Sequence, residues 1–290
     1  MRRQHARIFW QSPEGRLREL VGQSFVDTER IEDFRNLDQV TIIFTTHCEG
    51  MDEKLDKELG HLLRPFLDRG YNVGIGTGAS SGNMRAIGRH IADNFPKVLL
   101  IGSGNILPRQ VPDFTAHALT LFGGRHRRHR QTNLCMIGDQ FLALNGGRGT
   151  TGEIAEEAVD MSTGFTPPTF VGLADLMNLG GGKEKHQYEH FIRHFDLSAR
   201  VPSREHPLTA PWVSGLYLPV KGLKQYARQV LSFTDDPLKW WQERGIPDDY
   251  VKPALYSHAI HCQLTGRKPA RYYGPAFAHF GIDPQTVDLH

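Results

Sequence analysis

Residues 142–158 read LALNGGRGTTGEIAEEA, in which an apolar run is followed by a glycine-rich turn and then by acidic residues. Backbone N–H groups at the start of a helix attract anions, and Gly146, Gly147 and Gly149 would let the backbone approach a phosphate closely. The hydroxyl groups of Thr150 and Thr151 would cap the helix and donate further hydrogen bonds. The segment therefore predicts either a phosphate-binding turn or an ordinary strand-to-helix turn with a good cap.

Glu153 is expected in the first turn of the same helix, close to the position of a bound phosphate. A carboxylate there complements the helix dipole, so a purely structural role is one interpretation. A bound phosphate would repel that carboxylate, so its position there needs another explanation. Cleavage of a glycosidic bond passes through a positively charged, oxocarbenium-like sugar, which a nearby carboxylate stabilises. Glu153 beside a phosphate site therefore indicates chemistry at the sugar carbon of a phosphorylated ligand.

The chain up to residue 197 alternates between strand-like and helical patterns that would position this turn. Short β-branched apolar runs are typical of buried parallel strands, and apolar residues at helical spacing indicate helices between them. The expected strands are residues 40–44, 71–76, 97–102, 117–124, 140–147 and 168–173. The expected helices are residues 51–70, 81–95, the second half of 125–139, and 150–161. This alternation predicts an α/β fold, a Rossmann-like doubly wound parallel sheet with helices on both faces.

Three segments are expected along the chain: an N-terminal arm (1–37), a Rossmann-like nucleotide-binding domain (38–197) and a mainly helical C-terminal extension (198–290). In the extension, helices are expected at residues 221–234, 236–245 and 251–266. Its residues Trp240 and Trp241 are expected to anchor it hydrophobically, and Cys262 to fill a core. Ligands of doubly wound sheets bind outside the carboxyl ends of the strands. The two glycine-rich turns, at 74–82 and 146–149, both lie at such ends.

The run GGRGTTGE (146–153) resembles the G-G-x-G-T-x-x-E signature of the Lonely Guy family, part of the Rossmann-like SLOG superfamily. Arg130, Asp139 and the apolar run 141–144 stand before it at the spacing that the family shows. TGASSGNMRA (77–86) resembles the first glycine-rich loop of larger nucleotide nucleosidases of this kind. The resemblance covers roughly residues 38–197. It implies hydrolysis of the N-glycosidic bond of a nucleoside 5′-monophosphate, which gives free base and ribose 5-phosphate.

The resemblance also implies roles for individual residues. Glu153 would contact the ribose and stabilise positive charge at C1′, while Arg130 would assist departure of the base or anchor the nucleotide. The residues implied in binding phosphate and nucleotide are Gly146, Gly147, Gly149, Thr150, Thr151, Ser81, Gly82, Asn83 and Met84. Glu157 falls on the helical face of Glu153 and could orient it, although a solvated surface position is the favoured interpretation. No metal and no cofactor are implied.

Composition and charge bear on partners and location. The formal net charge of +2 argues against strong attraction to nucleic acid, and no apolar stretch reaches the roughly 20 residues of a membrane span. Three scattered cysteines fit a reducing cytoplasm. The basic run RHRRHR (125–130) is interpreted as a solvated loop with one functional arginine rather than as a nucleic-acid site. His186, His190 and His194 could bind a metal, but a helix surface is the favoured interpretation.

The resulting hypothesis is a cytoplasmic nucleotide N-glycosidase that needs no metal. Compact members of the family are dimers that share the site between subunits, so a homodimer or higher homo-oligomer is expected. Asn145, Ala79, Ser80, Arg85 and the run 45–47 depart from the family pattern in loops that form the base pocket, which leaves the nucleobase open. The alternative is a non-catalytic binder or sensor of a nucleotide-derived ligand. The pair of Arg130 and Glu153 distinguishes the two, because a pure binder has no need of the carboxylate.

Overall fold

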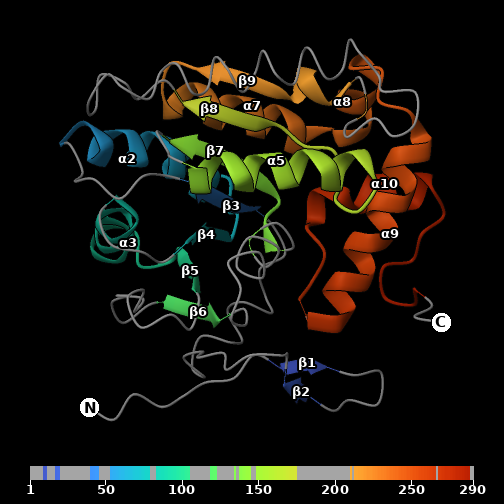
Figure 1. Cartoon of the computed structure of the whole chain (residues 1–290), viewed down its shortest axis with the longest axis horizontal. Coiled ribbons are helices and arrows are strands. Elements are labelled where there is room, and N and C mark those ends of the chain that lie inside the picture. The colour runs from blue at the N-terminus through green and yellow to red at the C-terminus, as the bar shows by residue number, and fades with distance from the viewer. Residues whose placement is uncertain are drawn as a thin grey trace.

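A computed structural model describes residues 9–11, 17–19, 40–45, 53–78, 83–104, 118–122, 134, 137–144, 148–174, 210, 212–265 and 267–287. These residues form one large sheet covered by helices, and a small separate hairpin (Figure 1).

The large sheet has seven strands in the order β6-β5-β4-β3-β7-β8-β9, and every neighbouring pair is parallel. The strands are β3 (Val40–Thr45), β4 (Val73–Thr77), β5 (Leu99–Gly104), β6 (Ala118–Phe122), β7 (Gln140–Leu144), β8 (Val171–Ala174) and β9 (Tyr217–Val220). From β3 the chain adds β4, β5 and β6 on one side, and β7 then starts a second run on the other side of β3. The predicted doubly wound parallel sheet is confirmed, and its strand order reverses between β3 and β7.

Helices cover the sheet on both faces. They are α2 (Glu53–Leu67), α3 (Asn83–Asn94), α5 (Arg148–Ser162) and α7 (Leu223–Asp235). The crossovers β3-α2-β4 and β7-α5-β8 run in opposite directions along the sheet, so right-handed connections place α2 and α5 on opposite faces. The helix α7 packs against α2, β8 and β9, and Figure 1 shows α5 in front of the sheet with α7 behind it.

The burial of these elements follows from their sequences. All residues of β4, β7 and β8 are buried, as expected for parallel strands with helices on both faces. On α2, the apolar positions at helical spacing are the buried ones; they are Leu59, Leu62, Leu63 and Phe66. After α2 the chain turns at Gly70, whose φ of 69° lies in the left-handed region that glycine adopts without strain.

The C-terminal extension contributes a strand as well as helices. The predicted helices appear as α7, α8 (Pro237–Glu243) and α9 (Asp248–Thr265), and are followed by η4 (Arg271–Tyr273) and α10 (Gly274–His279). The short helix η3 (Val213–Leu216) leads into β9, which pairs with β8 and continues the sheet. Pro219 is compatible with this position because β9 is an edge strand. The boundary between residues 197 and 198 stays a prediction, while residues 217–220 belong to the same sheet.

The described part of the N-terminal arm forms a two-stranded antiparallel hairpin. Its strands are β1 (Phe9–Gln11) and β2 (Leu17–Glu19), with Trp10 opposite Arg18. The strand β1 contacts α9, so the described part of the arm meets the C-terminal extension.

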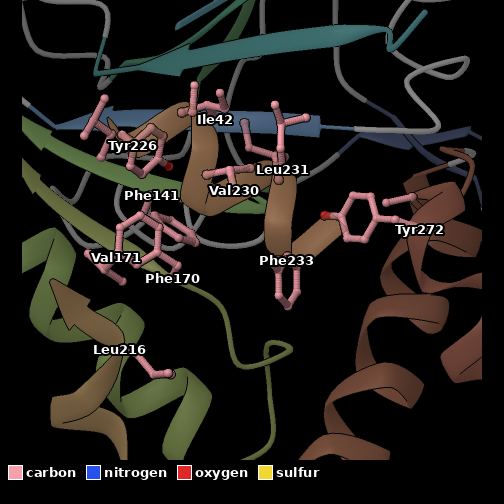
Figure 2. Close-up of a cluster of buried hydrophobic side chains, with 14 of the residues drawn as sticks. Ile42, Phe141, Phe170, Val171, Leu216, Tyr226, Val230, Leu231, Phe233 and Tyr272 are labelled. Carbon is pink, nitrogen blue, oxygen red and sulfur yellow. The ribbon is translucent and has the colours of Figure 1, made fainter. Parts of the chain in front are cut away.

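An apolar core joins α7 to the sheet and to the C-terminal helices (Figure 2). Tyr226 stacks on Phe170 with ring centroids 5.3 Å apart, and Phe233 meets Tyr272 at 5.7 Å. Trp240 and Trp241 also pack on Phe233, and the indole N–H of Trp241 donates to the carbonyl of Pro168 at 2.6 Å. The expectation that these tryptophans anchor the extension by burial is confirmed.

Gly172 on β8 gives a test of this packing. A Cβ atom there would lie 2.6 Å from Cε2 of Tyr226 and 3.0 Å from Cδ1 of Leu142. We expect Gly172→Ala to lower the free energy of unfolding by about 1–3 kcal/mol, because the ring of Tyr226 is held by Phe170. Urea denaturation of both proteins measures the difference.

Gly274→Ala is the matched control, since its φ of −51° and ψ of −51° are helical and nothing lies within 4 Å of a new Cβ atom. This variant should be as stable as the parent or more stable by up to about 1 kcal/mol. Equal losses in the two variants would contradict the close packing of α7 on β8.

Candidate functional site

The candidate site lies at the carboxyl ends of the central strands. Phe44 of β3 pairs with both Thr77 of β4 and Leu142 of β7, so these three strands end at the same edge of the sheet. The helix α5 begins at Arg148, four residues after the last residue of β7. Because the strand order reverses between β3 and β7, this edge is where doubly wound folds open a crevice for ligands.

The predicted phosphate-binding residues are described only in part. Gly149, Thr150 and Thr151 lie in the first turn of α5, where backbone N–H groups have no partner within the helix. Asn83 begins α3, and Met84 is buried within it. The remaining predicted residues of the site, Gly146, Gly147, Ser81, Gly82 and Arg130, lie outside the described residues, as do the side chains of Thr150, Thr151 and Asn83.

Glu153 is buried, with 5% of its surface exposed. The prediction that it lies in the first helical turn is wrong, because α5 starts at Arg148 and not at residue 150. With 3.6 residues per turn, Glu153 falls in the second turn. The helix dipole acts mainly within the first turn, so complementing that dipole explains Glu153 less well than the sequence suggested.

Glu157 lies one helical turn after Glu153 and is fully buried, with 0% of its surface exposed. Its carboxylate oxygen Oε1 accepts a hydrogen bond of 3.0 Å from the hydroxyl of Thr166. The favoured interpretation of a solvated surface residue is therefore wrong. Ile154, Ala158 and Met161 are fully buried on the same helix, which shows that this side of α5 faces the interior.

A buried ion pair stands at the opposite, amino-terminal end of β7. Both carboxylate oxygens of Asp139 lie 2.8 Å from Nη2 of Arg267, and each side chain is only 1% exposed. Asp139 also accepts a hydrogen bond of 2.9 Å from the backbone N–H of Thr41 on β3, and Arg267 donates to the carbonyl of Ile137 at 2.7 Å. This pair therefore ties the residues after α9 to the two central strands.

The charges of this pair depend on each other. Burial raises the pKa of Asp139, while Arg267 and the amide of Thr41 act against that shift. Burial acts to lower the pKa of Arg267, but Asp139 together with Cys262 and Tyr272 outweighs burial, so this pKa is raised. Since an arginine keeps its proton in proteins, we regard both partners as ionised. Arg267 is a residue that the sequence did not single out, because its partner lies 128 positions away.

Three further titratable residues of α9 lie near Arg267. Burial, with Arg267 and His261, lowers the pKa of His258 well below its ordinary value. Burial and Arg267 lower the pKa of His261 to about 3. Sγ of Cys262 lies 3.6 Å from Nε2 of His258, and burial raises the pKa of this thiol to about 12. A neutral, buried thiol is a poor nucleophile, so Cys262 fills a core as expected.

Other sequence features find limited counterparts. Among the described residues there is no group of three or more His, Cys, Asp and Glu side chains that could hold a metal ion. His186, His190, His194 and the run 125–130 lie outside those residues. A groove is lined by Asp248, Asp249, Lys252, Pro253 and Tyr256. It lies near the end of α5, because a Cβ atom at Gly164 would lie 3.2 Å from Cβ of Pro253. Within the same described ranges, no helix is long and apolar enough to cross a membrane.

Removing one partner of the buried ion pair should strongly destabilise the fold. Arg267→Met leaves the Asp139 carboxylate buried without its cation, and we expect a loss of about 3–5 kcal/mol in the free energy of unfolding. The double variant Asp139→Asn/Arg267→Met removes both charges and should recover part of this loss. Urea denaturation of the three proteins measures it.

The exposed pair of Arg69 and Asp235 is the control, with the same kind of contact at 3.0 Å but side chains that are 48% and 60% exposed. Arg69→Met should cost less than about 1 kcal/mol. A loss at Arg267 no larger than the loss at Arg69 would show that the buried pair does not hold the central strands.

The low pKa of His261 predicts a pH dependence of stability. The unfolded chain binds a proton at this residue near pH 6.5, whereas the folded chain does so only near pH 3. Between these values the unfolded chain holds more protons, so the free energy of unfolding falls as the pH falls, by up to about 1.4 kcal/mol per pH unit for one histidine. His261→Gln should make this slope shallower between pH 6 and pH 4.

Denaturation midpoints at several pH values give the slope, and His279→Gln, at an exposed position, serves as the matched control. If His261→Gln keeps the slope of the parent protein, His261 does not titrate as its burial requires.

In comparisons with protein-family models and with curated proteins, no match to this chain was found.

Proposed function

We propose that the chain hydrolyses the N-glycosidic bond of a nucleoside 5′-monophosphate and releases the free base and ribose 5-phosphate. The observation that carries this proposal is a buried carboxylate, Glu153, in the second turn of the helix that follows β7. That helix starts at the edge where the strand order reverses, which is the ligand-binding edge of doubly wound sheets.

A chemical role accounts for Glu153 better than a structural one. Glu153 places a carboxyl group on a side of α5 where the other buried residues include the apolar Ile154 and Ala158. Its position in the second turn weakens the explanation by the helix dipole. A carboxylate close to the sugar, in contrast, stabilises the positive charge that develops when a glycosidic bond breaks.

The proposed reaction uses the first turns of α5 in sequence. The backbone N–H groups of Gly149 and Thr150 hold the 5′-phosphate, helped by the positive end of the helix dipole. The ribose then extends towards Glu153, whose carboxylate stabilises C1′ as the C1′–N bond breaks. The electrons of the C1′–N bond leave with the base nitrogen, which takes up a proton. A water molecule then bonds to C1′ through its oxygen and releases one proton to solvent. Arg130 assists departure of the base in this proposal.

Replacement of Glu153 by glutamine tests the role of the carboxylate. The full chain is incubated with AMP, GMP, CMP, UMP and IMP and with modified nucleotides, and free base and ribose 5-phosphate are quantified by chromatography. We expect Glu153→Gln to fold normally by circular dichroism and to lose about 10²–10³-fold or more in turnover, because glutamine keeps the shape but not the charge. Arg130→Ala should lose a similar factor.

Glu156→Gln is the matched control, because Glu156 is half-buried on the same helix but off the sheet-facing side. It should keep the turnover of the parent. If Glu153→Gln hydrolyses nucleotides at a rate near that of the parent, the carboxylate of Glu153 has only a structural role in α5. Nucleotide binding without release of base by the parent protein would instead identify a sensor.

A further inference from the structure

The helix α5 carries two buried carboxyl groups one turn apart, Glu153 with 5% and Glu157 with 0% of the surface exposed. Residues four apart on a helix have Cβ atoms about 5–6 Å from each other and share a face. This face packs against β3, β7 and α9. Two carboxyl groups so close in a poorly solvated interior do not ionise independently.

We propose that Glu157 is a positioning residue for Glu153, acting as the second member of a buried carboxyl pair on α5. This inference rests on the proposed function, in which Glu153 stabilises positive charge on the sugar. It assigns to Glu157 no contact with the substrate, since Glu157 acts only through Glu153.

The turn after α5 holds Glu157 in place. Thr166 donates its hydroxyl hydrogen to Oε1 of Glu157 at 3.0 Å. The backbone of this turn is hydrogen-bonded to the end of α5. The N–H groups of Phe165 and Thr166 donate hydrogen bonds of 2.8 Å and 3.3 Å to the carbonyl of Asp160. The hydroxyl of Thr166 is therefore a fixed donor, and it favours one orientation of the Glu157 carboxyl group.

Tyr273 of η4 lies near Glu157. Burial, the charge of Asp139 and the charge of Glu157 raise the pKa of Tyr273, which places this phenol within electrostatic reach of Glu157. The ring of His258 on α9 lies 5.1 Å from that of Tyr273, and its lowered pKa keeps it neutral. Both groups remain uncharged at neutral pH, so neither of them adds a charge next to Glu157.

Other charged or titratable groups around this face have their own contacts. Nη2 of Arg267 contacts both carboxylate oxygens of Asp139 at the far end of β7, and Tyr217 of β9 donates its hydroxyl hydrogen to the carbonyl of Ile154. On α5 itself, burial and Glu156 raise the pKa of Asp160 to about 6. Glu153 and Glu157 are thus the carboxyl groups of α5 that are both buried and one turn apart.

This arrangement has a measurable consequence. A negative charge on Glu157 disfavours ionisation of Glu153, so Glu153 becomes active at a higher pH than it would alone. Removing the charge of Glu157 should let Glu153 ionise at lower pH. Removing the hydrogen bond from Thr166 should act in the same direction more weakly, because that bond favours the ionised form of Glu157.

The test is the pH dependence of kcat/KM for nucleotide hydrolysis in the parent, Glu157→Gln and Thr166→Val. We expect the acidic limb of the profile to move to lower pH by roughly one unit in Glu157→Gln, with KM little changed. In Thr166→Val the shift should be smaller but of the same sign. Glu156→Gln, three residues after Glu153 but more exposed to solvent than Glu157, should move the limb less than Glu157→Gln does. The proposal is overturned if the acidic limb of Glu157→Gln lies at the same pH as that of the parent. It is also overturned if Glu156→Gln moves this limb as far as Glu157→Gln does.

A second measurement separates this inference from the proposed function. Carbon-13 NMR of glutamate carboxyl groups follows Glu153 directly, with its signal identified by its absence in Glu153→Gln. The midpoint of this signal should move to lower pH in Glu157→Gln even if no nucleotide is hydrolysed. A moved midpoint without turnover would retain the carboxyl pair and reject the nucleosidase, whereas an unmoved midpoint would reject the pair.

Discussion

The buried ion pair of Arg267 and Asp139 links parts of the molecule that are far apart in sequence. The Asp139 carboxylate also accepts a hydrogen bond from the backbone N–H of Thr41. The side chain of Asp139 thus links β3, the start of β7 and the residues after α9. These two strands form the point where the strand order reverses, and their other ends bear the candidate site. A shift of β3 against β7 would therefore disturb the ion pair at one end and the glycine turn at the other.

Electrostatics also connect the C-terminal helices to α5. Tyr273 lies beyond residue 250, yet its pKa is influenced by Glu157 of α5 and by Asp139, which directly precedes β7. Tyr217 of β9 donates its hydroxyl hydrogen to the carbonyl of Ile154, and Trp241 of α8 donates to Pro168. Residues that looked like an addition to a nucleotide-binding domain thus provide much of the surroundings of the helix proposed to bear the reaction.

The fold was predictable where the local pattern is strong. The mainly apolar runs at 40–44 and 141–144 form most of β3 and β7, and the apolar spacing of α2 matches its buried face. The strand β9 was missed because it has four residues, includes Pro219 and lies in a proline-rich stretch. The strand β9 forms because it pairs with β8, and β8 lies more than 40 residues earlier in the chain. The sequence around residues 217–220 therefore gives little sign of this strand.

The candidate site was less predictable for related reasons. Glu157 stands in the run AEEAVD, which reads as a helix surface, and its donor Thr166 comes after the helix has ended. The start of α5 was placed two residues late, because Gly149 favours a turn yet is tolerated in a first helical turn. Whether Arg130 approaches Glu153 depends on long-range placement, on which local patterns carry no information.

The separation of 128 residues between Asp139 and Arg267 has a consequence for folding during synthesis. Ribosomes deliver the chain from the N-terminus, so β3 and β7 emerge well before residue 267 is made. Until then the carboxylate of Asp139 has no cation with which to enter the interior, and its burial is unfavourable. The junction of β3 with the start of β7 therefore gains its balancing charge only after most of the chain has been translated.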